Sequence, residues 1–174
     1  MRTLIRMKTF ETNSSSTHTL VIPRSIEKHN KLKYFKFHTG EYGWGFDSHV
    51  LCDYLWTAIL LMSGDEEYRI KNGLPTTEEW EEKIKKALSP YFEEVEFEYP
   101  TVDSWGWFNN CDIDHQSWYE ALQMLKDVWK DEDLLVNAVL EGTAFTGNDN
   151  SSPEDNPYRE EIENCGNSGN YEVY

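Results

Sequence analysis

The chain of 174 residues carries 32 Asp and Glu against 16 Lys and Arg, a formal net charge of −16 at pH 7. Its length and its seven Trp, eight Phe and ten Tyr suffice for one substantial hydrophobic core, and aromatic side chains outside that core are candidate contact anchors. The longest apolar run, residues 55–62, is too short to cross a bilayer, and residues 1–10 lack the apolar segment of a signal peptide. We therefore expect a cytoplasmic protein.

Charge is distributed unevenly along the chain. Residues 1–38 hold eight Lys and Arg against two acidic residues, a local charge of +6, while the other 136 residues sum to −22. An acidic body of this kind either keeps a protein soluble or complements a basic partner. The basic beginning is expected either to be neutralised by that body or to bind phosphate.

Three short strands are predicted near the start. Residues 2–9 and 17–23 are rich in Thr, Ile, Val and Leu and flank a polar connection, as in a hairpin with a long loop. Residues 32–38 alternate aromatic with polar side chains, which predicts a third strand. In residues 40–49 glycines are interleaved with aromatic residues, which predicts a tight loop without a nucleotide-binding pattern.

Two helices follow in the predicted order. Residues 49–62 are apolar around almost the whole circumference of a helix, which predicts a helix buried at the centre of the domain. Residues 76–90 begin with Thr77 as a predicted cap, continue with acidic residues and then lysines, and carry one apolar stripe. This pattern predicts an amphipathic surface helix that Pro90 ends.

A strand with one acidic face is predicted over residues 93–99. Side chains of a strand alternate between its two faces, so the apolar residues share one face and three carboxylates form a row on the other, about 6 to 7 Å apart. Such a row is able to bind a divalent ion or a basic partner, or it is a solvated strand face. We assign it to partner binding; its members are Glu94, Glu96 and Glu98.

A second helical block closes the predicted fold. After an aromatic loop at 104–112, residues 116–130 carry an apolar helical face, and residues 132–142 form a shorter apolar helix with Gly142 at its C-cap. Strands and helices come in blocks without strict alternation, which predicts an α+β fold with an antiparallel or mixed sheet.

The predicted domain organisation is simple. Residues 1–146 are expected to form a single α+β domain, and residues 147–174 an acidic, polar C-terminal tail. The tail is rich in turn-forming residues, so it is either irregular or ordered only against the body or a partner.

The polar connection of the first hairpin is the best candidate for a chemical site. Hydroxyls, an amide and turn N–H groups are able to surround phosphate oxygens, and flanking cations supply the charge. We therefore expect phosphate or RNA to be bound by Arg2, Arg6, Lys8, Asn13 and Arg24.

The same loop suggests catalysis as an alternative. His18 is able to exchange a proton near neutral pH beside a ribose 2′-hydroxyl or a serine, so His18, Ser14, Ser15 and Ser16 are candidate catalytic residues. The other interpretation is that His18 faces the core as a hydrogen-bonded structural histidine and that the serines form an ordinary turn.

Metal and redox chemistry are not predicted. Cys52, Cys111 and Cys165 are scattered without CxxC spacing, and the histidines show no HExxH or HxH pattern. Residues 111–115 gather two aspartates and a histidine, but a loop before a helix is the simpler interpretation. We expect no cofactor and no metal.

The opening residues resemble a known group of proteins. Residues 1–22 are similar to the start of small phage and mobile-element proteins that begin with a short basic strand followed by E-T-N-S-S-S-x-H. The matching positions here are Glu11, Thr12, Asn13, Ser14, Ser15, Ser16 and His18. Size, acidity and that context look like an anti-CRISPR protein, an inhibitor of the single-effector type II nuclease.

The resemblance implies a function in the host bacterial cytoplasm. Within the anti-CRISPR class some members resemble nucleic acid electrostatically, and others interfere with guide RNA loading or promote guide truncation. A CRISPR effector holds its guide in a positively charged channel, which an acidic body is able to enter. The leading hypothesis is thus an inhibitor that binds the effector and affects its guide RNA. The alternatives are an RNA-cleaving or phosphotransfer enzyme centred on the serine and histidine loop, and a structural virion accessory.

Overall fold

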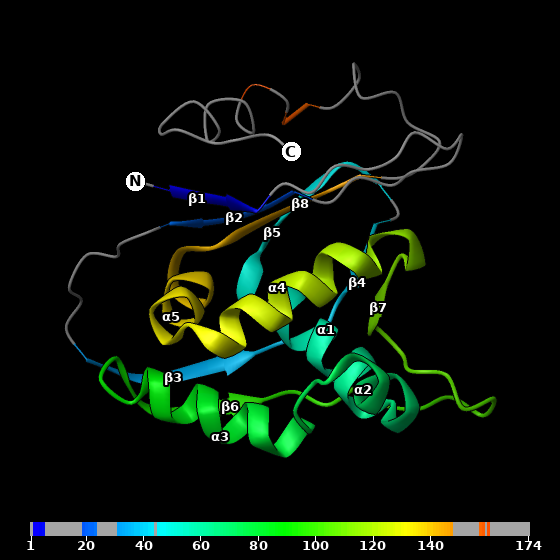
Figure 1. Ribbon diagram of the computed structural model, residues 1–174, viewed down its shortest axis with the longest axis horizontal. Helices are drawn as coiled ribbons and strands as arrows, with labels where there is room; N and C mark the ends of the chain where they lie inside the picture. Colours follow the sequence, from blue (N-terminus) through cyan, green and yellow to red (C-terminus); the bar gives the residue numbers. More distant parts are fainter. Residues whose placement is uncertain are drawn as a thin grey trace.

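The computed structural model in Figure 1 describes most of the chain between residues 31 and 147 and shorter pieces outside it. At residues 2–5, 23 and 116 it describes the backbone alone. The described ranges are 2–5, 19–23, 31–43, 45–147, 157–158 and 160. They form a single α+β domain with both antiparallel and parallel strand pairs, as the sequence predicts.

A four-stranded antiparallel sheet forms one side of the domain. It consists of β1 (Arg2–Ile5), β2 (Thr19–Pro23), β8 (Thr143–Thr146) and β5 (Asp47–Val50), in that spatial order. The pairing of β1 with β2 confirms the predicted hairpin over its described residues. Strand β8, from the far end of the chain, lies between β2 and β5 and joins them.

Two short parallel pairs lie outside this sheet. Strand β3 (Leu32–Phe37) pairs with β6 (Phe92–Phe97), and β4 (Glu41–Tyr42) pairs with β7 (Asp112–Ile113). Parallel neighbours need a long crossover connection, and three helices supply it between β3 and β6.

The helices fill the space between the strands. The crossover contains α1 (Leu51–Gly64), α2 (Glu66–Asn72) and α3 (Thr77–Leu88), and the second block contains α4 (Trp118–Lys130) and α5 (Glu132–Glu141). In Figure 1 the four-stranded sheet lies above α1, α4 and α5, and the β3–β6 pair lies below them with α3. Within the described residues, no helix has the length and apolarity needed to cross a membrane.

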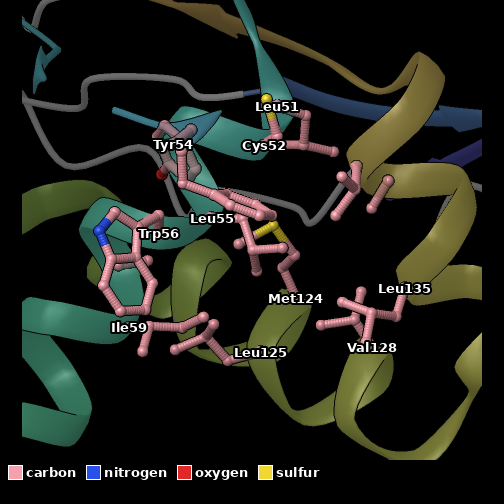
Figure 2. Packing of buried hydrophobic residues seen from close by; sticks show 14 of the residues in the cluster. Leu51, Cys52, Tyr54, Leu55, Trp56, Ile59, Met124, Leu125, Val128 and Leu135 are labelled. Atoms are coloured by element: carbon pink, nitrogen blue, oxygen red, sulfur yellow. The ribbon is translucent and has the colours of Figure 1, made fainter. Parts of the chain in front are cut away.

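Helix α1 is the centre of the hydrophobic core. Figure 2 shows its side chains, Leu55 and Ile59 among them, pointing toward Leu125 and Val128 of α4 and Leu135 of α5. All five are 0% exposed. Each fully buried side chain of this size contributes about 1.5–3 kcal/mol of transfer free energy. The prediction of a buried central helix is therefore confirmed.

The predicted start of this helix is wrong by two residues. Residues 47–50 pair with β8 instead, with His49 opposite Ala144, so the helix begins at Leu51 and the predicted loop at 40–49 contains β4 and β5. An apolar run does not distinguish a strand from the first turn of a helix, and only the pairing partner decides.

The cap of α3 also differs from the prediction. Thr76, not Thr77, is the N-cap: its hydroxyl accepts from the amide of Glu79 at 3.2 Å, and the Glu79 carboxylate accepts from the Thr76 amide at 2.7 Å. These two bonds form a capping box. Helix α2 was not predicted; Asp65 caps it, and Gly73 ends it at a φ of 66°.

The second helical block follows its prediction closely. A 3₁₀ turn, η1 (His115–Ser117), precedes α4, and α5 ends with Gly142 at its C-cap. Strand β8 after it was not predicted because its four residues carry too short a pattern. Of the predicted tail, Tyr158 packs its ring against Phe145 of β8, with ring centroids 5.5 Å apart.

Candidate functional site

The β3–β6 pair separates an apolar face from a polar one. On the inner face Phe37 stacks on Phe97, with centroids 5.0 Å apart and planes 14° from parallel, and Phe35 contacts Phe92. Tyr34 of the outer face is 47% exposed. The alternation predicted for both strands is therefore present, although β6 ends at Phe97 and Tyr99 lies beyond it.

A diagonal ladder joins the outer side chains of the two strands. Tyr34 is opposite Glu94 in the register, but its hydroxyl donates to Glu96 Oε2 at 2.6 Å. Lys36 is opposite Glu96, but its Nζ lies 3.8 Å from Glu98 Oε2. Each β3 side chain thus reaches the carboxylate two residues beyond its partner, an offset within the reach of long side chains.

His38 completes this ladder just beyond β3. Its Nδ1 lies 2.7 Å from the same Oε2 atom of Glu98, and its backbone N–H donates to Asp53 of α1 at 2.8 Å. Two of the three predicted partner-binding carboxylates are therefore held by side chains of their own chain. Glu94 is exposed, and no hydrogen bond or ion pair joins it to another described residue.

The carboxylates change the acidity of Tyr34. Its hydrogen bond to Glu96, together with desolvation and the charges of Glu96 and Glu94, raises the pKa of the phenol to about 12. The hydroxyl therefore stays protonated at neutral pH and keeps donating to the carboxylate. The ladder fixes the row without removing its negative charge.

An ordered hairpin lies directly after this row. Between residues 101 and 110 an isolated bridge pairs Val102 with Phe108, and Asp103 N–H donates to the Trp107 carbonyl at 2.9 Å. The Asp103 carboxylate accepts from the amides of Trp105 and Trp107 at 2.8 and 2.9 Å. Gly106 supplies the left-handed turn, at a φ of 86°.

Large apolar side chains of this hairpin face water. Trp105 is 84% exposed and Trp107 is 75% exposed, and Val102 and Phe108 are also exposed. Figure 1 shows the segment between β6 and β7 extending away from the helices. The sequence predicted an aromatic loop at 104–112 but no site there. Two tryptophans on either side of a glycine, preceded by a turn-capping aspartate, were the available signal.

The hairpin and the carboxylate row adjoin. Both arms of the connection bond to the segment that ends β3: Glu98 N–H donates to the Phe37 carbonyl at 2.9 Å, and Asp112 N–H donates to the Gly40 carbonyl at 3.0 Å. The Asn110 side chain adds a 3.0 Å bond to the Thr39 carbonyl. Together, residues 93–114 form one surface, here called the acidic aromatic surface.

The charge of this surface has one sign in its own sequence. From residue 87 to residue 125 the chain has no lysine or arginine and eight acidic residues. Glu41 of β4, opposite Asp112 in the register, adds a further exposed carboxylate near the base of the hairpin. Basic side chains reach it only from β3, where Lys36 and His38 both face Glu98.

The predicted phosphate and catalytic site lies largely outside the described residues. Arg2 falls in β1, where the backbone alone is described. The other members are not among the described residues and stay predictions: Arg6, Lys8, Asn13, Ser14, Ser15, Ser16, His18 and Arg24.

Neither described cysteine is suited to nucleophilic chemistry. Cys52 and Cys111 are buried free thiols, and burial, with smaller contributions from neighbouring aspartates, raises the pKa of each to about 12. A thiol must ionise to attack, so both are inert at neutral pH. Among the described residues, no group of three or more His, Cys, Asp or Glu is placed to hold a metal ion.

Comparison with known proteins adds no relative. No protein-family model, no curated protein and no solved structure matches this chain.

Proposed function

We propose that this protein is an inhibitor that binds a basic, nucleic-acid-binding host protein through its acidic aromatic surface. The observation that carries the proposal is the continuity of the carboxylate row of β6 with an ordered hairpin that exposes two tryptophans. The first feature complements a cationic surface, and the second supplies apolar contact area.

The proposed partner is the effector nuclease of a type II CRISPR system. The resemblance in residues 1–22 suggests this partner, and the charge of the folded body supports it: residues 31–147 hold 23 acidic and 10 basic residues. Such an effector binds guide RNA and heteroduplex in a positively charged channel, where an acidic protein competes with phosphate. The inhibitor would thereby interfere with guide RNA loading or integrity.

The proposal is tested by measuring binding to purified type II effectors with and without guide RNA. Wild-type protein is compared with Glu93→Gln/Glu94→Gln, which removes two exposed charges from β6 that the ladder does not hold. Glu132→Gln/Asp133→Asn is the matched control, since it removes two exposed charges from the start of α5. We expect the β6 variant to bind more weakly, mainly through slower association, and the difference to shrink as salt is raised.

Two results would reject the proposal. One is the absence of binding to any effector tested; the other is an equal loss of affinity in the β6 variant and its control. A His18→Ala variant separates binding from RNA cleavage. The inhibitor proposal expects its binding to be unchanged, whereas the alternative enzyme expects it to lose guide RNA trimming while remaining folded.

A further inference from the structure

We propose that the hairpin of residues 101–110 is the anchor of this interface, and that Trp105 and Trp107 insert into an apolar pocket of the partner protein whose rim carries lysine and arginine. The inference deepens the proposed function and rests on it for the partner being a basic protein. It assigns the apolar contact to two side chains and the charge contact to their surroundings.

The exposure of these tryptophans sets them apart from the others that the structure describes. Trp56 and Trp80 are fully buried, and Trp118 and Trp129 are partly buried against the core. The hairpin tryptophans are 84% and 75% exposed although the chain has a core of ample size. Tryptophan is the residue type most enriched among side chains that dominate binding free energies.

The hairpin presents these rings from an ordered backbone. Asp103 alone receives three of its contacts, since its carboxylate accepts from two amides and its carbonyl accepts from the Gly106 amide at 3.2 Å. A further pair of bonds joins Asn109 to Thr101, one between backbone groups at 2.8 Å and one between side chains at 3.0 Å. An anchor that is ordered before binding loses less conformational entropy on association.

Charge decides which kind of partner fits around the anchor. The chain on both sides of the tryptophans is acidic, with Glu96 and Glu98 before the hairpin and Asp112 and Asp114 after it. A second copy of this chain or a nucleic acid would bring like charges together at this rim. A protein pocket bordered by lysine and arginine is therefore the complementary occupant.

The first test uses the full chain and a purified type II effector. Trp105→Ala/Trp107→Ala is compared with Leu32→Ala/Val50→Ala, which removes two exposed apolar side chains from other strands. We expect the hairpin variant to bind at least about tenfold more weakly, chiefly through faster dissociation, and the control to stay within about twofold. If wild type binds and the hairpin variant keeps its affinity, the anchor is overturned while the proposed function stands.

The second test does not depend on the effector. A photoreactive phenylalanine, p-benzoylphenylalanine, replaces Trp105 in the full chain, and its crosslinks in bacterial cells are mapped by mass spectrometry. We expect crosslinks to apolar residues of a protein segment that also carries lysine and arginine. Crosslinks only to nucleic acid or to a second copy, or no crosslinks, would overturn the anchor. A mapped basic pocket on a protein that is no CRISPR effector supports the anchor and rejects the proposed partner.

Discussion

Tyr34 of β3 donates a 2.6 Å hydrogen bond to Glu96 of β6, two residues beyond the position opposite it in the strand register. The same diagonal offset joins Lys36 to Glu98. The acidic row is therefore an ordered set of carboxylates, two of which are held from the neighbouring strand. Glu94 at its start has no such bond to a described residue, which makes it the member most available to a partner.

Removing the charge of Glu96 should restore ordinary acidity to Tyr34. The hydrogen bond to Glu96 is the largest cause that holds the pKa of this phenol at about 12, so Glu96→Gln should move it toward the usual value of about 10. NMR titration of the tyrosine ring carbons measures the shift, and Tyr34→Phe assigns the resonance. An unchanged Tyr34 pKa in Glu96→Gln would show that the bond does not form in solution.

Glu120 of α4 should make stability depend on pH. Its side chain is 6% exposed, its Oε2 atom has no hydrogen-bond partner, and burial raises the pKa of its carboxyl. A raised pKa means that its favourable contribution is complete below the unfolded value near 4.3 and is lost as pH rises through the folded value. Glu120→Gln should thus be more stable than wild type at pH 7, by about 1 kcal/mol.

Urea denaturation of both proteins at pH 4 and pH 7 measures this effect. The difference in free energy of unfolding between Glu120→Gln and wild type should be larger at the higher pH. Comparing the two proteins at each pH cancels the titration of the other carboxylates. A difference that stays constant between pH 4 and pH 7 would contradict the prediction.

The N-terminal cap of α3 should be sensitive at one threonine and not at its neighbour. Thr76→Ala removes the hydroxyl that accepts from the Glu79 amide and should lower the free energy of unfolding by about 1 kcal/mol. Thr77→Ala is the matched control, because Thr77 is already the first residue of the helix. Chemical denaturation should give a clear loss for the first variant and little change for the second; the reverse order would place the cap at Thr77.

Gly142 should not tolerate a side chain. Its φ of −72° is accessible to any residue, but a Cβ at this position would collide with the Ala138 carbonyl oxygen and with the Leu51 side chain. The Leu51 amide also donates to the Gly142 carbonyl at 3.0 Å, which fixes the close approach of the start of α1 to the end of α5. Gly142→Ala should therefore lower the free energy of unfolding by roughly 1–3 kcal/mol.

Gly64→Ala provides the comparison for this variant. Gly64 lies at the end of α1, and a Cβ there meets nothing within 4 Å. Thermal or chemical denaturation should show little loss for Gly64→Ala. Equal losses in the two variants would mean that the destabilisation at Gly142 is not caused by the close approach.

The sequence by itself determined the elements whose periodicity extends over several turns or residues. The apolar stripe of α3, the apolar face of α4 and the nearly uniform apolarity of α1 each predicted a helix, and the alternation in 93–99 predicted β6 with its carboxylate face. These patterns are local, since a helix forms its hydrogen bonds within its own segment and alternation follows from strand geometry alone.

Only the tertiary structure decided the short strands and the exposure of individual side chains. β5 and β8 have four residues each, and they become strands because Val50 pairs with Thr143, far away in the sequence. The same holds for the surface: the parallel register of β3 and β6 brings Tyr34 to Glu96, and the folding of the core elsewhere leaves Trp105 in water. Such contacts join residues distant in sequence, and no local periodicity encodes which distant segment a strand or a ring will meet.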